Sequence, residues 1–312
     1  MSDEIFNTVI IGSGPAGYTA AIYACRSGLN PLLITGPEPG GQLITTPEIG
    51  NWPGRKDAPD GFTLMDSLKE HALSLGTRVS SSIVTSVNFQ DEIKKLTLKN
   101  GEIVKTRTVI ISTGAKARYL GLESEEAYKG KGVSACATCD GFFFRNKDVA
   151  VIGGGSAAFV EALYLSNLCK KVYIIHRREQ FRAEKVMVDR LRELEKSGKV
   201  EFVLNATVDK VEGDGSMVTG ISLNIKDKGK RSISLDGIFV AIGHEPATGI
   251  FKGELELDEQ GYIKTGFTTA TSTSAQGVFA AGDCADKVYR QAITSAGEGC
   301  KAALDVEKYL LG

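Results

Sequence analysis

The chain carries one glycine-rich pattern twice, and this repeat restricts its fold more than any other feature of the sequence. Residues 9–17 read VIIGSGPAG and residues 149–158 read VAVIGGGSAA. Each copy is an apolar β-branched run, then GxGxx(G/A), then a segment with helical periodicity. Such a glycine pattern is informative only where it follows a strand and begins a helix, which both copies do. The repeat therefore predicts two strand–turn–helix units of the kind that bind dinucleotides.

The spacing of these small residues has a physical basis. The first permits a tight turn, the second lets a pyrophosphate approach the backbone, and the third lets the helix pack closely on the strand. The helix then presents free N–H groups to the phosphate. The positions are Gly12, Gly14 and Gly17 in the first copy and Gly153, Gly155 and Ala158 in the second. Two copies predict two dinucleotides, or one large dinucleotide and a relic; the alternative is two such units without a ligand.

Periodicity elsewhere predicts further alternation of strands and helices. We expect helices over 16–27, 62–75, 156–168, 183–196 and 291–310, and strands over 31–35, 108–115, 171–176, 235–243 and 277–283. Residues 36–54, rich in Gly, Pro and Thr, are predicted to form a long irregular loop. Loops of that length inside a domain are usually functional. The predicted fold class is α/β, with two Rossmann-like dinucleotide-binding domains.

The order of the elements predicts that the second domain is inserted into the first. The first domain would be discontinuous and consist of residues 1–114 and 247–312, with the second domain over residues 115–246. The chain would cross between them near Ala115–Ala117 and His244–Pro246. Both crossings contain small or turn-forming residues, as hinges often do.

Composition excludes several classes of protein. Of 312 residues, 42% are hydrophobic, which is enough for buried cores and excludes a disordered chain. The 37 Lys and Arg residues balance 38 Asp and Glu residues, so we expect no nucleic-acid partner. No apolar run reaches the ~18–20 residues that span a bilayer, so no membrane association is expected. Asp3 and Glu4 replace the basic start of a signal peptide, which predicts a cytoplasmic location.

A basic cluster lies at the end of the strand over 171–176. It contains His176, Arg177, Arg178 and Arg182, where an NAD site would carry an acidic residue that holds the ribose. Arginine matches phosphate oxygens with two parallel hydrogen bonds. The cluster therefore predicts that the second domain prefers NADPH to NADH. The alternative is a solvated run of charges that leads into a helix.

Two of the six cysteines, Cys136 and Cys139, have CxxC spacing, and Asp140 follows them. Three interpretations compete: a redox-active pair, two inert buried thiols, or half of a zinc site. Zinc needs four ligands, and no second CxxC or paired histidine is present. In a redox pair one thiol has a lowered pKa, and Asp140 could exchange a proton with a thiolate. The other cysteines are irregularly spaced and are expected to serve core packing.

Ten motifs now occur in order along nearly the whole chain. They are GSGPAG, GGQL, NWPG, STGA, CATCDG, GGGSAA, HRR followed by a further Arg, GHEP, GDC and RQAITSAGEG. The sequence resembles the low-molecular-weight thioredoxin reductases, for which CATCDG with the downstream arginines is highly specific. The resemblance implies FAD in the first domain, NADPH in the second, thioredoxin as the protein substrate and a homodimer. One departure is GGGSAA, where many relatives have GGGNTA.

The resemblance also implies roles for individual residues. The FAD contacts would be Ser13, Gly14, Pro15, Ala16, Gln42, Asn51, Val84, Asp283, Arg290, Gln291 and Ala292. Among these, Val84 would contact the adenine end through its backbone, and Asp283 a ribityl hydroxyl. The NADPH contacts would be Gly153, Gly155, Ser156, His176, Arg177, Arg178 and Arg182. Cys139 would face the flavin, Cys136 would attack the substrate, and Asp140 would be the acid; no metal is expected.

The order of the motifs has a mechanical consequence. The CxxC and the NADPH fingerprint belong to one domain, yet both must react with one flavin in the other domain. Hydride transfer needs reacting atoms roughly 3–3.5 Å apart. If both use the same face of the flavin, the inserted domain must rotate between the two half-reactions. A dithiol oxidase that passes electrons to oxygen, and a non-catalytic redox-sensing module, remain alternatives; ferredoxin–NADP reductases of this type lack the CxxC.

Overall fold

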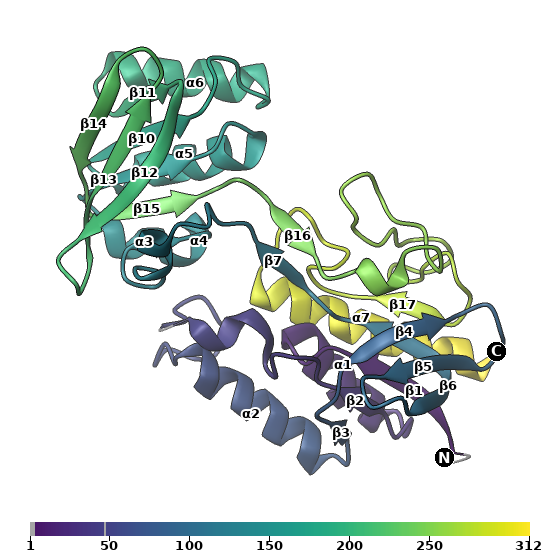
Figure 1. Ribbon diagram of the computed structural model, residues 1–312. Coiled ribbons are helices and arrows are strands. Elements are labelled where there is room, and N and C mark those ends of the chain that lie inside the picture. The colour runs from purple at the N-terminus through teal and green to yellow at the C-terminus, as the bar shows by residue number, and fades with distance from the viewer. Residues whose placement is uncertain (1–3, 47) are drawn as a thin grey trace. The chain divides into compact units, whose positions relative to one another are not determined.

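A computed structural model describes residues 4–46 and 48–312 and divides the chain into two units (Figure 1). The first unit is Met1–Lys116 with Glu245–Gly312, and the second is Ala117–His244. The sequence placed each boundary two residues away from these positions. The two crossing segments contain short strands, β7 (Ala115–Ala117) and β16 (His244–Pro246), that pair with each other. Each boundary falls inside a strand, so no loop rich in Gly, Pro or polar residues marks it in the sequence.

The first unit is built on a seven-stranded sheet. Its strands are β1 (Ile5–Ile11), β2 (Leu32–Ile34), β3 (Arg78–Ser80), β4 (Val84–Asn88), β5 (Lys94–Leu98), β6 (Ile103–Ile111) and β17 (Val278–Ala280). Strands β3, β2, β1, β6 and β17 are parallel and adjacent in that order. The first half of β6 pairs antiparallel with β5, and its last three residues pair with β17. The parallel strands therefore end at one common edge.

The parallel strands of this sheet are apolar on both faces, and α-helices cover one of these faces. The helices are α1 (Pro15–Arg26), α2 (Gly61–Ser74) and α7 (Ala292–Leu311), with 3-10 helices η1 (Gly41–Thr45) and η3 (Gly249–Phe251) in the connections. Ile10 of β1 packs in the core with residues of α1 and α7, whereas Val9 and Ile11 pack in a second core with the β4–β5 hairpin. This alternation explains the continuous apolar run of β1.

The second unit has a five-stranded parallel sheet and a three-stranded antiparallel sheet. The parallel sheet consists of β8 (Val133–Ser134), β9 (Asp148–Ile152), β10 (Lys171–His176), β11 (Val200–Leu204) and β15 (Gly237–Val240). The antiparallel sheet consists of β12 (Ala206–Gly213), β13 (Val218–Ile225) and β14 (Gly229–Ser234). The helices are α3 (Glu123–Glu126), α4 (Ala137–Asp140), α5 (Ser156–Leu168) and α6 (Lys185–Lys196), with the 3-10 helix η2 (Gly141–Phe144). The antiparallel sheet packs on one face of the parallel sheet, and α5 and α6 pack on the other (Figure 1).

Most expected elements are present with small shifts of their ends. The helix over 156–168 and the strand over 171–176 have the predicted bounds. The strand expected over 108–115, with a tight turn at its end, starts earlier than predicted, since β6 begins at Ile103; the strand ends at Ile111, and the turn follows it. The loop expected over 36–54 contains η1, so it is not irregular throughout; residue 47 lies outside the described residues. In the part of the chain that the structure describes, no helix combines the length and apolarity needed to cross a bilayer.

Candidate active site

The two CxxC cysteines form a disulfide in the second unit, with their Cα atoms 5.3 Å apart. Cys136 caps the short helix α4, and its Sγ accepts a hydrogen bond from the Cys139 backbone N–H at 3.2 Å. The hydroxyl of Thr138 lies 3.4 Å from the same sulfur. After reduction these two donors would stabilise a thiolate on Cys136 rather than on its partner. Cys136 is half-buried, whereas Cys139 is exposed.

Asp140 closes the same helical turn and is half-buried. Burial raises the pKa of its carboxyl above the usual range, and a hydrogen bond with the Ser134 hydroxyl partly opposes that effect. A carboxyl in this environment holds a proton closer to neutral pH than an exposed aspartate does. The residue is therefore chemically suited to donate and accept protons beside the disulfide.

Two of the other four cysteines, Cys169 and Cys284, are buried in environments that suppress reactivity. Burial raises the pKa of Cys169 to about 11 and that of Cys284 to about 12. Cys25 and Cys300 are half-buried, and the Cys25 sulfur lies 3.2 Å from the Thr77 hydroxyl. A thiol is nucleophilic only as the thiolate, so the two buried thiols are inert near neutral pH.

The first fingerprint has the shape that a dinucleotide pyrophosphate requires. Gly12 has a φ of +108°, and a Cβ atom there would lie 2.2 Å from the Ser112 carbonyl oxygen. A Cβ atom at Gly14 would meet no atom within 4 Å, so the backbone is open to a ligand at this point. Helix α1 begins at Pro15 and has no side-chain cap. Its first-turn N–H groups are thus available to an anion.

Two predicted FAD residues use their side chains for internal structure. The Ser13 hydroxyl donates to the Thr35 carbonyl and accepts from the Gly40 N–H, both at 3.0 Å. Ala16 is buried against α7, where a Cβ atom at Gly299 would lie 2.1 Å from the Ala16 carbonyl oxygen. Only the backbone of Ser13 and Ala16 is therefore free to contact a cofactor.

Other predicted FAD residues gather where the parallel strands end. The Gln42 amide donates to the carbonyl of Ala115, which follows β6. Asp283 follows β17 and accepts a hydrogen bond from the Ser295 hydroxyl at 3.0 Å. Burial raises the pKa of Asp283 to about 6. A buried carboxylate with acceptor capacity to spare is suited to a ligand hydroxyl.

The N-terminus of α7 carries three further predicted FAD residues. Gln291 caps the helix in a reciprocal pair with Thr294, and Ala292 is the first helical residue. The Asn51 amide donates to the Gln291 side-chain oxygen at 3.4 Å, which brings the loop after η1 to the same end. Arg290 has a φ of +46°, and its guanidinium donates to the Lys287 carbonyl at 3.0 Å.

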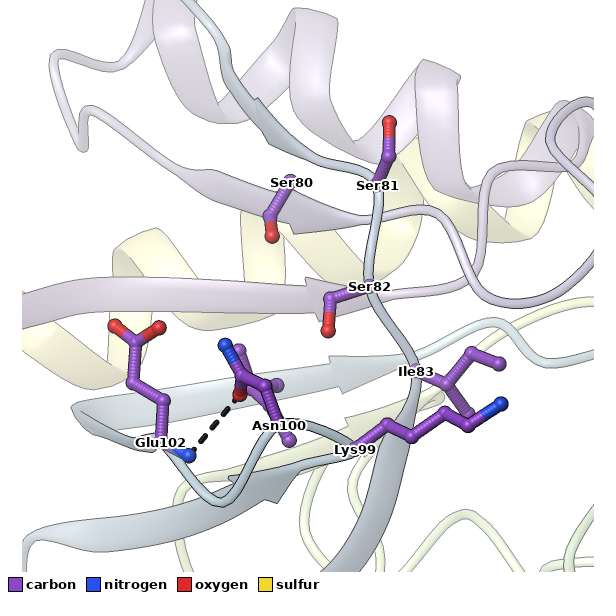
Figure 2. Close-up of a pocket in the computed structure, with 8 residues that line it drawn as sticks. Ser80, Ser81, Ser82, Ile83, Lys99, Asn100 and Glu102 are labelled. Carbon is purple, nitrogen blue, oxygen red and sulfur yellow. Dashed lines mark hydrogen bonds between the residues drawn. The ribbon is translucent and has the colours of Figure 1, made fainter.

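Val84, expected near the adenine, lies beside a polar pocket. The pocket has a volume of about 460 Å³. Figure 2 shows its lining residues on the segment that leads into β4 and around the turn between β5 and β6. Its lining residues are Ser80, Ser81, Ser82, Ile83, Leu98, Lys99, Asn100 and Glu102. The carbonyl of Ser82 accepts the Gly36 N–H at 3.1 Å, so the pocket adjoins the carboxyl end of β2.

The second fingerprint repeats this geometry in the second unit. A Cβ atom at Gly153 would lie 2.4 Å from the Ala241 carbonyl oxygen, whereas one at Gly155 would meet nothing within 4 Å. Helix α5 begins at Ser156 without a side-chain cap. His176 ends β10, and the Arg182 backbone N–H donates to the Gly154 carbonyl at 2.8 Å. The basic cluster therefore lies directly beside the fingerprint.

The three guanidinium groups of this cluster are exposed and available. Across residues 4–46 and 48–312, no carboxylate forms an ion pair with Arg177, Arg178 or Arg182. The one acidic residue among them, Glu179, accepts a hydrogen bond from the Asn205 amide at 3.0 Å. A phosphate group would therefore not have to displace an existing salt bridge.

Sequence reasoning missed the residues that support the predicted ones. Ser134, Thr138 and Ser295 donate hydrogen bonds to predicted catalytic or cofactor residues but were not singled out. For Ser295 a signal existed, because it lies one helical turn after Gln291 and Ala292 inside the RQAITSAGEG motif. For Ser134 the contact depends on the turn between β8 and α4, which the sequence did not predict.

Fold and site together define a class of protein: an α/β oxidoreductase with two dinucleotide fingerprints and a disulfide. Residues 6–299 match the pyridine nucleotide-disulphide oxidoreductase family. A thioredoxin reductase of Escherichia coli O157:H7 is 54% identical, over 97% of this chain and 96% of that protein. A Pseudomonas fluorescens protein named glucosaminate ammonia-lyase is 53% identical over 97% and 95%. The solved thioredoxin reductase of Giardia duodenalis has a TM-score of 0.93 at 39% identity, covering 99% of this chain and all of that one.

This chain belongs to the pyridine nucleotide-disulphide oxidoreductases and, within them, to the thioredoxin reductases. The resemblance inferred from the ten motifs is thereby confirmed, as are the oxidoreductase activity and the fold class with two Rossmann-like domains. Membership implies a flavin and a nicotinamide cofactor and a thioredoxin substrate. The assignment of individual contacts to these molecules remains a prediction.

Proposed function

We propose that the chain transfers electrons from NADPH through FAD to the Cys136–Cys139 disulfide and then to oxidised thioredoxin. The observation that carries this proposal is the disulfide itself, held at a helix N-terminus in the unit that bears the second fingerprint. FAD, when bound, would relay two electrons from a hydride donor to a disulfide. The open backbone at Gly14 and the buried carboxylate of Asp283 support its place in the first unit.

The sulfur chemistry follows from the local hydrogen bonds. Two electrons and two protons convert the disulfide to two thiols. The Cys136 thiolate then attacks a thioredoxin sulfur and displaces the other as a thiolate, which leaves a mixed disulfide. Cys139 next attacks Cys136, which regenerates the internal disulfide and releases thioredoxin as a dithiol. The donors aimed at Cys136 support its role as nucleophile, and the exposure of Cys139 suits a sulfur that must meet a group outside its own unit.

Protons and cofactors would be handled by the remaining predicted residues. Asp140, with its raised pKa, would supply and remove the protons of the two sulfurs. The backbone of Ser13, Gly14 and Ala16 would bind the FAD pyrophosphate, with Asp283 on a ribityl hydroxyl. Gln42, Asn51, Arg290, Gln291 and Ala292 would surround the flavin, Val84 the adenine, and Pro15 would start the helix at the pyrophosphate. Gly153, Gly155, Ser156, His176, Arg177, Arg178 and Arg182 would bind NADPH.

Rotation of the inserted unit between the half-reactions belongs to the same proposal. It is supported by chain order, since the disulfide and the second fingerprint lie in one unit and the first fingerprint lies in the other. A homodimer in the cytoplasm, without nucleic-acid or membrane partners, remains a prediction. Sedimentation of the holoenzyme and fractionation of cells test its first two parts.

The docking of thioredoxin has a candidate surface beside the disulfide. Phe142 and Phe143 follow Asp140 after a single glycine and expose 65% and 43% of their surface. Exposed aromatic side chains are enriched where proteins bind one another. We expect Phe142→Ala to raise the KM for thioredoxin several-fold, with little change in the rate at which NADPH reduces the flavin, because the residue acts only on the protein substrate.

The deciding experiment has two arms, both with the flavin-loaded protein. The first measures NADPH oxidation with oxidised thioredoxin, and the second measures ammonia release from glucosaminate. We expect turnover that requires thioredoxin and no ammonia release. The relative named as a lyase makes the second arm necessary, and elimination of ammonia needs no redox disulfide. Ammonia release that survives Cys136→Ser plus Cys139→Ser, without thioredoxin reduction by the unaltered protein, would overturn the proposal.

A further inference from the structure

The His176 ring lies directly on Gly154, the middle glycine of the second fingerprint. A Cβ atom at position 154 would lie 2.2 Å from Cε1 and 2.4 Å from Nδ1 of His176. Real Cβ atoms essentially never approach another atom to less than 3.0 Å, so a side chain at position 154 would force the His176 ring to move. The φ of Gly154 is outside the left-handed region, so the backbone itself would accept alanine. The need for glycine at position 154 therefore comes from the histidine.

The same two residues hold the loop that carries the arginines. His176 Nε2 lies 3.2 Å from the Gln180 carbonyl oxygen, and the Arg182 N–H donates to the Gly154 carbonyl at 2.8 Å. Burial, together with the neighbouring arginines, lowers the pKa of His176. The ring is therefore neutral near pH 7, and a proton on Nε2 would donate to Gln180. Residues 176–182 are thus fastened to the fingerprint at both ends of the loop.

The middle of the loop is fixed by aromatic packing. The Phe181 ring lies 4.8 Å from that of Phe159, on α5, and 5.4 Å from that of Phe202, on β11, measured between centroids. Phe159 is fully buried. A side chain at position 154 would push the His176 ring off Gly154 and away from the Gln180 carbonyl, while Phe181 stays packed on Phe159. Arg177 and Arg178, which lie between His176 and Gln180, would then lose this support.

We propose that Gly154 determines specificity for the 2′-phosphate of the nicotinamide cofactor, because it admits His176 as the positioning residue for Arg177 and Arg178. The inference rests on the proposed NADPH function of the second unit. Bidentate contacts between arginine and phosphate depend on the placement of the guanidinium plane. The pyrophosphate contact depends instead on Gly155, whose missing side chain faces open space. The two glycines should therefore affect different parts of the ligand.

The test compares two ligands that differ only in the 2′-phosphate, adenosine 2′,5′-bisphosphate and adenosine 5′-monophosphate, by calorimetric titration of the holoenzyme. Gly154→Ala should raise the Kd of the bisphosphate about tenfold or more and that of the monophosphate by less than about twofold, as expected for loss of charge-assisted bonds. Gly155→Ala is the matched control and should weaken both ligands by the same factor. His176→Ala should reduce the same discrimination as Gly154→Ala.

The double variant shows whether Gly154→Ala acts through overlap with the His176 ring or by disturbing the structure in general. With the ring absent, an alanine at position 154 meets no obstacle, so Gly154→Ala with His176→Ala should bind like His176→Ala alone. Discrimination that is unchanged in Gly154→Ala and in His176→Ala overturns the inference; if Gly154→Ala does not fold, His176→Ala decides. Failure of the proposed function is distinguishable, because the unaltered protein would then bind both ligands equally, or Arg177→Ala plus Arg178→Ala would leave the preference intact.

Discussion

At the scale of single residues, the two sulfurs of the disulfide differ before any substrate arrives. Two hydrogen bonds reach the Cys136 sulfur, and Cys139 is the more exposed of the pair. Hydrogen bonds to the charged form lower a thiol pKa. The spacing CxxC predicts a redox pair but not which sulfur is the nucleophile, because that depends on where the helix begins. The difference between the two sulfurs thus arises because α4 begins directly after Cys136.

Replacement of Cys139 separates the two halves of the reaction. Cys139→Ser should leave the yellow protein and its reduction by NADPH intact and lower thioredoxin reduction at least ~10³-fold, as loss of a group that acts in a covalent step does. Stopped-flow absorbance measures the first property and steady-state NADPH oxidation the second. Cys25→Ser is the control, since a hydroxyl can keep the contact with Thr77, and it should retain turnover. Normal thioredoxin reduction by Cys139→Ser would contradict the mechanism.

The buried carboxylate of Asp283, which is predicted to bind the cofactor, should lower the stability of the apoprotein near neutral pH. Its pKa of about 6 in the folded chain exceeds the ordinary 3.8 because of burial. The folded state then binds the proton more tightly, so the free energy of unfolding falls as pH rises from about 4 to about 6. The loss is roughly 3 kcal/mol at pH 7 and above. Asp283→Asn should recover part of it at pH 7.5 and nothing below pH 4, in urea unfolding of the apoprotein.

The same substitution should weaken the cofactor site, which tests the role of Asp283. Asparagine keeps an acceptor for the Ser295 hydroxyl but presents only one oxygen, so we expect FAD to bind at least about tenfold more weakly by fluorescence titration. A stability gain that is the same at pH 4 and pH 7.5 would rule out the titration of this carboxyl as its cause.

At the scale of elements, α1 and α7 approach closely because small residues line their contact. Buried alanines of both helices share one core, and Gly299 of α7 leaves room for the Ala16 carbonyl. This contact connects the fingerprint helix to the segment that holds Gln291 and Asp283. A change at Gly299 should therefore reach the predicted cofactor site through the backbone of Ala16.

Two glycines on α7 provide a matched pair to test that contact. A Cβ atom at Gly299 would lie 2.1 Å from the Ala16 carbonyl oxygen, whereas one at Gly297 would meet nothing within 4 Å. Gly299→Ala should destabilise the protein by about 1–3 kcal/mol through overpacking. Gly297→Ala should stabilise it by up to about 1 kcal/mol, since alanine favours the helix. Thermal unfolding measures both, and equal effects of the two substitutions would contradict the close packing.

Among the helices, strands and loops, those with strong local signals could be predicted from the sequence alone. The helix over 156–168 and the strand over 171–176 follow from local signals, an apolar β-branched run and a glycine turn, and both appear with the expected bounds. The interior of 36–54 could not be predicted, because η1 is held by Ser13 and Ala115, which are distant in sequence. The burial of the Ala16 side chain and the contact of His176 with Gly154 likewise depend on tertiary packing.

At the scale of the whole molecule, the chain leaves the first unit after β6 and returns before β17, and these two strands pair with each other. The sheet of the first unit therefore contains strands from both sides of the insertion in the sequence. The inserted unit has its own hydrophobic cores. An insertion connected by two short paired strands, β7 and β16, is suited to move as a body. The chemistry requires such motion if nicotinamide and disulfide use the same face of the flavin.

Reversible cross-linking tests this motion on the intact enzyme. Oxidised holoenzyme would be treated with an amine-reactive cross-linker that contains ester bonds, and molecules joined between residues 117–244 and the first unit would be identified by peptide mapping. We expect reduction of their flavin by NADPH, or their thioredoxin turnover, to fall at least about tenfold, because a fixed arrangement serves only one half-reaction. Dithionite, which needs no rotation, should still reduce the flavin, and hydroxylamine cleavage of the linker should restore turnover. Full turnover while the two units remain joined would show that the inserted unit does not need to rotate.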